Sequence, residues 1–372
     1  MSTTFVPFVD LKAQYLAIKP EIDQAIQRVI DETAFIRGKY VQEFETQYAA
    51  KYGVNHCVSV ANGTDAIYVL LKALGIGNGD EVITVANSWI SSSETISQTG
   101  ARPVFVDIEP DYHNIDPSRI EEKITPRTKA IIPVHLYGQP ADIVKIQEIC
   151  KKHNLHLIED TAQSHFAELQ GKTVGTFGIG STFSFYPGKN LGAYGDAGAI
   201  ITNDDQLAQR ARRFANHGAM SKHDHEIEGI NSRLDGLQAA ILSVKLKYID
   251  KWNDSRNKNA LYYNELLSGI DGVITPKIRE NCKHVFHLYV IRTGQRQELM
   301  EHLKSMNIQT GIHYPRALPF LTAYQYLNHT PDDFPVAYKY QDEILSLPMF
   351  PELQKEQMEY VATAVRDFFK NK

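Results

Sequence analysis

The spacing of apolar residues divides the chain into alternating helices and strands. Near the N-terminus, Ile18, Ile22, Ile26 and Val29 recur at helical spacing, which predicts a helix with one buried face. From residue 56 onward, short apolar runs are separated by polar turns and helical stretches. The predicted strands are 56–60, 81–86, 103–108, 130–136, 155–159, 181–186 and 198–202.

Several of these runs are apolar almost throughout, for example AIIPVHL and LHLIED. Such runs are typical of strands covered by helices on both faces. The alternation therefore predicts an α/β fold with three layers and a mostly parallel sheet. Because ligands bind at the carboxyl ends of parallel strands, we expect Gly63, Trp89, Asp160 and Lys189 near one sheet edge.

The last third of the chain changes character after an amphipathic helix predicted at 234–248. A further helix at 252–267 leads out of the large domain, and a short strand (284–292) and a helix (297–306) follow. We expect a large domain over residues 1–250. A smaller α+β domain over residues 251–372 would be completed by the N-terminal helix.

The composition is that of an ordinary globular protein. The 372 residues are 43% hydrophobic and 22% charged, and the formal net charge of -5 gives no general basis for nucleic-acid binding. No apolar run reaches membrane-spanning length, and Asp10 and Lys12 near the start do not fit a secretory signal. The cysteines, Cys57, Cys150 and Cys282, are odd in number and lack metal-ligand spacing, which predicts free thiols and a cytoplasmic location.

Candidate chemistry begins with Lys189, which follows the strand at 181–186 after the bend at Pro187 and Gly188. The glycines around it leave room for a ligand close to the backbone. A lysine in a partly desolvated pocket loses its proton more easily and can form a Schiff base with a carbonyl. The alternative is a solvated surface lysine.

Other polar residues after strands complete the requirements of pyridoxal 5'-phosphate (PLP). This cofactor needs a carboxylate for its ring nitrogen, donors for its phosphate and a flat contact on its ring. Asp160 offers the carboxylate, although an Asp after an apolar strand more commonly caps a helix. Gly63, Thr64 and Ser184 offer the donors, although Asn-Gly-Thr-Asp also fits a simple turn. Trp89 offers the ring contact, unless it is a core residue.

A series of motifs, in order along nearly the whole chain, gives more specific information about the kind of protein. They are PFVDLKAQY, ANGTDAI, GIGNGDEVIT, ITPRTKAIIPVHLYGQPAD, IEDTAQS, FSFYPGKNLGAYGDAGAIIT, INSRLDGLQAAIL and HYP. In these motifs the chain resembles the PLP-dependent nucleotide-sugar aminotransferases of the DegT/StrS type, which have the aspartate aminotransferase-like fold type I. The resemblance implies Lys189 as Schiff-base lysine and catalytic base, and Asp160 as partner of the ring nitrogen. It also places Gln163 by the PLP hydroxyl, Trp89 against the ring, and Gly63, Thr64 and Ser184 at the phosphate. Asn231 would reach the phosphate from the neighbouring subunit of a homodimer.

The resemblance further implies transfer of an amino group from L-glutamate to a nucleotide-linked keto-sugar. Candidate sugar contacts are Tyr186, His313, Tyr314 and the loop 217–225. In that loop Lys222, His223 and His225 would meet a diphosphate, unless the loop is a solvated surface segment. Members acting on 4-keto sugars commonly have histidine at the place of Tyr186. This favours carbon 3 of a dTDP-3-keto-6-deoxyhexose, in amino-sugar biosynthesis for an O-antigen, an S-layer or an antibiotic.

The chain departs from the family pattern at two places. Thr161 replaces a usual alanine, and Pro319 stands where many relatives have histidine, which puts that sugar contact in doubt. A related dehydratase branch has histidine in place of the lysine, so Lys189 argues against it. The alternatives are a UDP-linked 3-keto sugar acid or a 4-keto sugar as substrate, a PLP-binding regulator without turnover, and another PLP enzyme such as a C–S lyase.

Overall fold

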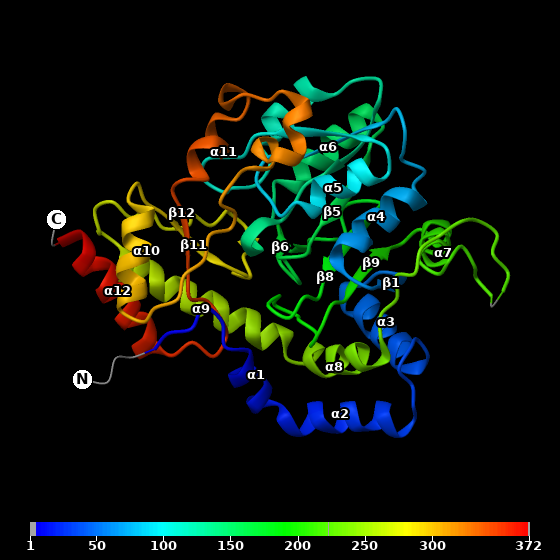
Figure 1. Ribbon diagram of the computed structural model, residues 1–372, viewed down its shortest axis with the longest axis horizontal. Coiled ribbons are helices and arrows are strands. Elements are labelled where there is room, and N and C mark those ends of the chain that lie inside the picture. The colour runs from blue at the N-terminus through cyan, green and yellow to red at the C-terminus, as the bar shows by residue number, and fades with distance from the viewer. Residues whose placement is uncertain (1–4, 222, 371–372) are drawn as a thin grey trace.

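The computed structural model describes residues 5–221 and 223–370, and a seven-stranded sheet lies at its centre (Figure 1). The strand order is β1-β9-β8-β5-β4-β2-β3, and only β9 runs antiparallel to its neighbours in this sheet. The strands are β1 (His56–Val60), β2 (Glu81–Val85), β3 (Arg102–Val106), β4 (Thr128–Ile132), β5 (His156–Asp160), β8 (Gly180–Ser184) and β9 (Gly198–Thr202). The predicted α/β fold with a mostly parallel sheet is confirmed.

Side chains alternate between the two faces of this sheet. In β9, Ala199 and Ile201 pack on one side, whereas Ile200 packs on the other. Both faces are buried because helices cover each of them, which explains the continuously apolar strands. One layer contains α4 (Gly63–Ala73), α5 (Ser91–Gln98) and α7 (Asp205–Phe214); the other contains α2 (Lys19–Asp31), α3 (Lys39–Tyr52), α6 (Ile143–His153) and α8 (Gly236–Leu246).

The element ends follow local chemistry. Helix α3 ends at Gly53, which adopts the left-handed conformation with φ 68°. Helix α4 begins after Asn62, whose side chain accepts a hydrogen bond from the Asp65 N–H at 2.8 Å. Strand β4 ends at Ile132, earlier than predicted, because the next residue, Pro133, has no N–H to donate.

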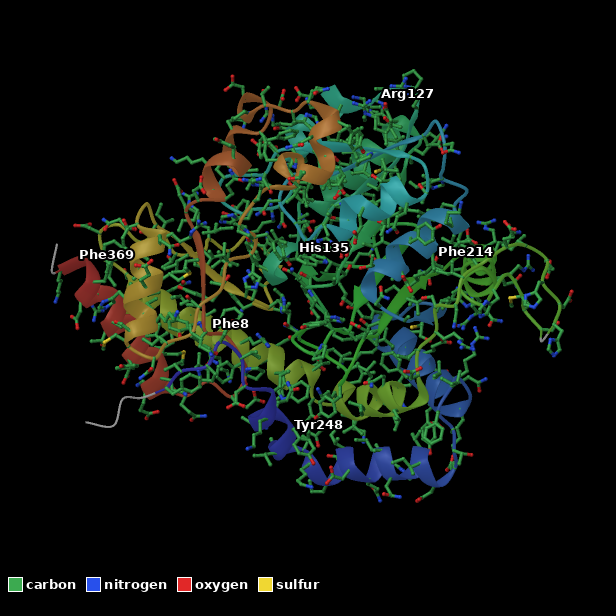
Figure 2. The ribbon with its side chains drawn as sticks, in the orientation of Figure 1. Phe8, Arg127, His135, Phe214, Tyr248 and Phe369 are labelled. Atoms are coloured by element: carbon green, nitrogen blue, oxygen red, sulfur yellow. The ribbon has the colours of Figure 1, made fainter. Side chains whose placement is uncertain are left out.

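A second unit forms around β11 (Tyr289–Arg292) and β12 (Ile344–Leu347), which pair antiparallel. Its core includes residues of α9 (Ile249–Leu267), α10 (Arg296–Ser305) and α12 (Lys355–Lys370), with Val6 from the N-terminal segment. The backbone of Val6 bonds to Asn307 and Gln309 at 3.0 Å each. Figure 2 shows Phe8 where this segment passes the C-terminal helices.

The N-terminal helix lies elsewhere than predicted. Helix α2 packs on α8 through Ile22, Ala25 and Val29, so a short extended segment, and not this helix, completes the C-terminal unit. The reason is its apolar stripe, which is buried in one core cluster with Ala240, Ile241 and Val244 of α8. Some C-terminal residues also pack beside the central sheet, for example Tyr324 and Phe334 against Phe105. The domain boundary at residue 250 stays a prediction.

The remaining elements are short. They are α1 (Leu11–Ala17), α11 (Pro335–Tyr340), β6 (Glu168–Leu169), β7 (Lys172–Thr173), β10 (Cys282–Lys283), and the 3-10 helices η1 (Pro117–Arg119), η2 (Glu121–Lys123), η3 (Leu136–Gly138), η4 (Leu318–Phe320), η5 (Thr322–Leu327) and η6 (Pro331–Asp333). Among the described residues, no helix combines the length and apolarity needed to cross a membrane. Cys57, Cys150 and Cys282 are free thiols.

Candidate active site

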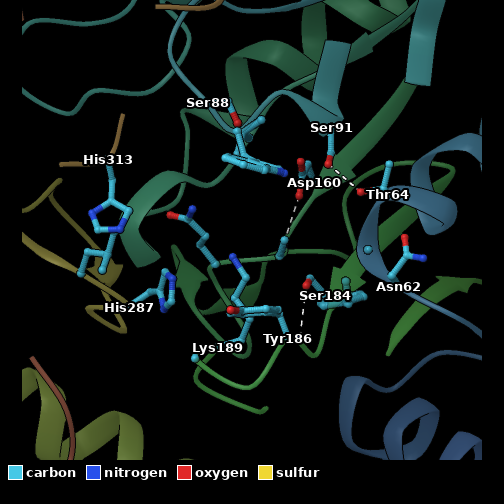
Figure 3. A pocket seen from close by; sticks show the side chains of 18 of the residues that line it. Asn62, Thr64, Ser88, Ser91, Asp160, Ser184, Tyr186, Lys189, His287 and His313 are labelled. Atoms are coloured by element: carbon cyan, nitrogen blue, oxygen red, sulfur yellow. Dashed lines mark hydrogen bonds between the residues drawn. The ribbon is translucent and has the colours of Figure 1, made fainter. Parts of the chain in front are cut away.

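A cavity of about 540 Å³ opens at the carboxyl edge of the sheet, between the sheet and the C-terminal unit (Figure 3). Most residues predicted from the sequence line it. They are Gly63, Thr64, Trp89, Asp160, Gln163, Ser184, Tyr186, Lys189, His313 and Tyr314. Segments distant in the sequence therefore converge on one cavity, as the strand-end rule predicts.

Lys189 projects into the cavity from a closed loop. Its N–H donates to the Tyr186 carbonyl at 2.8 Å, and the Ala193 N–H closes the loop onto the Phe185 carbonyl at 2.7 Å. Burial lowers the pKa of Lys189 to about 8, and the nearby Asp160 carboxylate opposes that shift. The surface alternative is wrong, because the amine is held in a partly desolvated cavity.

Asp160 ends β5 and is buried, with 6% of its surface exposed. Burial raises the pKa of its carboxyl group, whereas the Ala162 N–H, 3.1 Å from Oδ1, and the charge on Lys189 lower it. Residues 161–166 form turns, so the helix-cap alternative for Asp160 is wrong. A buried carboxylate thus faces the same cavity as the lysine amine.

The start of α4 forms an open cradle of backbone donors. Gly63 is its first residue, and a Cβ at this position would lie 2.6 Å from the Ser184 Cβ, so only glycine fits. The Thr64 and Ser91 hydroxyls bond to each other at 2.6 Å beside it. The turn predicted here is present, with Asn62 as its cap, and it leaves the positive helix end facing the cavity.

Two aromatic rings also line the cavity. Trp89 is 58% exposed, so it is not a core residue, and its ring lies 5.6 Å from that of Tyr314, centroid to centroid. The Tyr314 hydroxyl accepts a hydrogen bond from Gln163 Nε2 at 3.1 Å. The other end of that amide, Oε1, accepts from the Tyr137 N–H at 2.7 Å, which fixes its orientation.

His313 is held on three sides. Its Nδ1 bonds to the Ser346 hydroxyl at 2.8 Å, its ring stacks on Phe8 at 5.6 Å, and its carbonyl accepts from the Tyr137 hydroxyl. Burial and the charge on Lys189 lower the pKa of His313 to about 4, so the imidazole is neutral at pH 7.

Of the other predicted residues, Asn231, His223 and His225 do not line this cavity. Asn231 lies in an exposed loop before α8, paired through its backbone with Asn216, and it does not line the cavity of its own chain. His223 is exposed in the 217–225 loop, also away from the cavity lining. Lys222 lies outside the described residues.

Phe8 and His287 are among the lining residues that the sequence reasoning missed. Phe8 falls within the PFVDLKAQY motif, which is the signal that draws attention to it. His287 stands in the apolar run predicted as a strand, where a histidine normally looks like a core residue.

Comparison with known proteins shows the family to which the chain belongs. The model of the DegT/DnrJ/EryC1/StrS aminotransferase family matches residues 16–366. The chain belongs to this aminotransferase family.

Curated relatives of this aminotransferase cover nearly its full length. A "pleiotropic regulatory protein" of Geobacillus stearothermophilus is 46% identical over 98% of this chain and 99% of the relative. A dTDP-3-amino-3,4,6-trideoxy-alpha-D-glucose transaminase of Streptomyces venezuelae is 42% identical over 98% and 97%. A UDP-2-acetamido-2-deoxy-3-oxo-D-glucuronate aminotransferase of Pseudomonas aeruginosa is 42% identical over 97% and 99%.

Solved structures agree with the fold. The crystal structure of S. venezuelae DesV with a ketimine intermediate has a TM-score of 0.96 to this aminotransferase at 42% identity, covering 99% of each chain. The structure of Bacillus subtilis NtdA with bound cofactor PMP has a TM-score of 0.91 at 31% identity, covering 100% of this chain and 86% of NtdA. These likenesses confirm fold type I.

PLP is the cofactor of this family, and the cavity fits it. The lining supplies a lysine with a lowered pKa, a buried carboxylate and a helix start at which only glycine fits. PLP requires an amine, a carboxylate for its ring nitrogen and donors for its phosphate, so the chemistry of this lining fits the cofactor. The enzyme is thus a PLP-dependent sugar aminotransferase of this family.

Proposed function

We propose that this aminotransferase moves the amino group of L-glutamate to carbon 3 of a dTDP-linked 3-keto-6-deoxyhexose. The observation that carries the proposal is Tyr186, whose side chain is 59% exposed on the cavity wall three residues before Lys189. Its phenol stands where it can contact a sugar hydroxyl beside the reacting carbonyl. A phenol and an imidazole differ in reach, so this position can select which carbon faces the amine.

When bound, PLP supplies a protonated ring that withdraws the electrons left by a broken C–H bond. We assign the Asp160 carboxylate to the ring nitrogen, Gln163 to the hydroxyl side and Trp89 to the ring face. Gly63, Thr64 and Ser184 hold the phosphate at the start of α4.

Lys189 is the proton carrier in this proposal. Its Nζ takes the proton from the α-carbon of L-glutamate and later delivers a proton to carbon 3 of the sugar. A pKa of about 8 suits this role, because a larger fraction of the amine is neutral at pH 7 than for an ordinary lysine. Lys189→Ala should keep its fold and lose turnover.

The choice of nucleotide rests on the relatives. The S. venezuelae relative is named for a dTDP-3-amino sugar, and the P. aeruginosa relative, at the same identity, for a UDP-linked 3-oxo sugar. The first name places nitrogen at carbon 3 and the second places an oxo group there, so together they support that position more than they support dTDP. His313 and Tyr314 line the same cavity and complete the sugar contacts in the proposal.

The experiment is a coupled assay with L-glutamate and a panel of dTDP- and UDP-linked 3-keto and 4-keto sugars, followed by NMR of the product. Nitrogen on carbon 4 would overturn the regiochemistry. Nitrogen on carbon 3 of a UDP sugar alone would overturn the choice of dTDP. A protein that binds PLP but turns over no sugar would favour a regulator, the role in the name of the G. stearothermophilus relative.

We further propose a homodimer in which Asn231 serves the partner's site. Asn231 is exposed and lies before α8, outside the cavity of its own chain. The 217–225 loop, with Lys222, His223 and His225, is the candidate for the sugar diphosphate across the same interface. Mixing Lys189→Ala protein with an impaired Asn231→Ala protein should restore activity in hybrid dimers, because one site regains both groups. No rescue in hybrids shown to form would contradict the crossing.

A further inference from the structure

His287 enters the cavity from the C-terminal side, in the segment before β11. Its backbone is fixed from two directions. The Arg256 guanidinium donates through Nη1 to the carbonyls of Phe286 and His287, at 3.2 Å each. Gly138, at φ 102°, approaches so closely that a Cβ there would lie 2.7 Å from the His287 nitrogen. The backbone that carries the imidazole is therefore held by hydrogen bonds and close packing.

The tautomer of His287 follows from the amide next to it. Asn190 is buried, and its Nδ2 donates both hydrogens, to the Val285 carbonyl at 2.9 Å and to Asn253 Oδ1 at 2.8 Å. A backbone carbonyl only accepts, so the amide cannot be turned around. Asn190 Oδ1 is therefore the atom that lies 3.3 Å from His287 Nδ1, and Nδ1 must carry the hydrogen of that bond.

The other ring nitrogen is consequently an acceptor. Burial and the charges on Lys189 and Arg256 keep the pKa of His287 well below its usual range, so the ring stays neutral at pH 7. With the hydrogen on Nδ1, the Nε2 atom has a lone pair. Among the described residues it has no hydrogen-bond partner, although the ring lines the cavity. Figure 3 shows the His287 ring beside Lys189.

A fixed, neutral acceptor is selective about what it binds. It repels carboxylate and phosphate oxygens, so it suits neither the carboxylates of L-glutamate nor a diphosphate. It binds an O–H or N–H group. In L-glutamate the only such group outside its carboxyl groups is the amine that is transferred. The sugar, by contrast, keeps hydroxyl groups beside the carbonyl carbon throughout the reaction.

We propose that His287 is a specificity-determining residue whose Nε2 accepts a hydrogen bond from a sugar hydroxyl adjacent to the reacting carbonyl carbon. This inference rests on the proposed function of the cavity. Together with Tyr186 of the same cavity, His287 holds the sugar ring beside Lys189 and so fixes which carbon meets the amine. Binding energy at this atom serves the sugar half of the reaction alone.

Substituting His287 by the shorter or the longer amide side chain tests the roles of its two ring nitrogens separately. In His287→Asn the amide replaces Nδ1 and keeps the bond to Asn190, but the cavity loses its acceptor. In His287→Gln the terminal oxygen reaches the place of Nε2 and restores an acceptor. Calorimetry measures binding of a dTDP-linked 3-keto-6-deoxyhexose, and of its UDP counterpart, to the PLP form. That form has no amine to donate, so binding is observed without turnover.

We expect His287→Asn to weaken sugar binding about tenfold and His287→Gln to stay within about threefold of the wild type. The rate of the glutamate half-reaction, followed by the visible absorbance, should change less than about threefold in both. Equal sugar binding by all three proteins would overturn the inference, and so would a parallel loss of the glutamate half-reaction. If His287→Asn does not fold, sugar binding is compared between His287→Gln and His287→Met instead. Methionine has a similar length but no acceptor oxygen, so this pair also differs in the acceptor at the place of Nε2. Wild-type protein that aminates none of the sugars would instead overturn the proposed function, and this inference with it.

Discussion

Lys245 offers a sharp test of how the loop of Lys189 is supported. It lies on α8 with 1% of its surface exposed, donates through Nζ to the Gly192 carbonyl at 2.7 Å, and stands 4.2 Å from the centre of the Tyr194 ring. Burial lowers the pKa of Lys245 from 10.5 to about 7, against a smaller opposing effect of Glu352. The protein therefore contains a buried amine whose charge is costly.

The size of that cost follows from the shift. A change of about 3.5 pKa units corresponds to about 5 kcal/mol at 1.36 kcal/mol per unit. Below pH 7 the lysine is charged in the folded and the unfolded chain, so the full cost is present. Between pH 7 and 10.5 only the unfolded chain binds the proton, so the free energy of unfolding rises by about 1.4 kcal/mol per pH unit. Above pH 10.5 the cost is gone.

Lys245→Met removes the charge at similar length but leaves the Gly192 carbonyl without its donor, a loss of about 1–3 kcal/mol. The variant should be more stable than the wild type by about 2–4 kcal/mol at pH 7, and less stable by about 1–3 kcal/mol near pH 10.5. The sign of the difference in stability should therefore change with pH.

Thermal unfolding of the variant and the wild type from pH 6.5 to 10.5 measures this difference in stability. For a chain of this length, each kcal/mol corresponds to a change of about 1–2 °C in Tm. The matched control is Lys247→Met just after α8, because Lys247 is exposed and pairs with Glu21 at 3.1 Å on the surface. Such a pair contributes about 0–1 kcal/mol, so its loss should shift Tm little. A difference between Lys245→Met and the wild type that stays constant over this pH range would refute the reasoning.

Three further changes test other parts of the structure. Asp160→Asn should still bind PLP but turn over at least about tenfold more slowly, because a neutral amide does not stabilise a protonated ring nitrogen; normal kcat with full PLP content would contradict this. Gly63→Ala should weaken PLP binding, measured by titration of the apoenzyme, because the new Cβ would lie 2.6 Å from the Cβ of Ser184. The control Gly77→Ala should bind PLP normally, because the nearest neighbour of its Cβ would be 3.4 Å away. Equal PLP affinities of the two variants would count against the cradle. Asp107→Ala should lower the free energy of unfolding, measured in urea, by about 2–4 kcal/mol. The reason is that the buried carboxylate accepts hydrogen bonds from the N–H groups of Val336 and Ala337 at 2.9 Å each. An unchanged unfolding midpoint would show that α11 is held by other contacts.

Much of the fold and the centre of the site could be predicted from the residues alone. Short apolar runs alternating with helical stretches specify a covered parallel sheet, because each face must be buried by a helix. Lys189 and Asp160 could be placed together because the carboxyl ends of parallel strands meet at one edge. The glycine at the start of α4 could also be predicted as part of an anion site, because a strand followed by a small polar turn and a helix is a local sequence pattern.

Only the tertiary structure decided which other side chains surround that centre. Phe8 and His287 come from segments outside the strand-turn-helix pattern, and no periodicity marks them as cavity residues. The acceptor nitrogen of His287 depends on Asn190, Val285 and Asn253, which meet only through packing over long sequence separations. Likewise α2 joins α8, and Val6 joins the C-terminal unit, because those faces are complementary in space. Local spacing determines which residues form an element, whereas shape and hydrogen-bond complementarity between elements determine what each one meets.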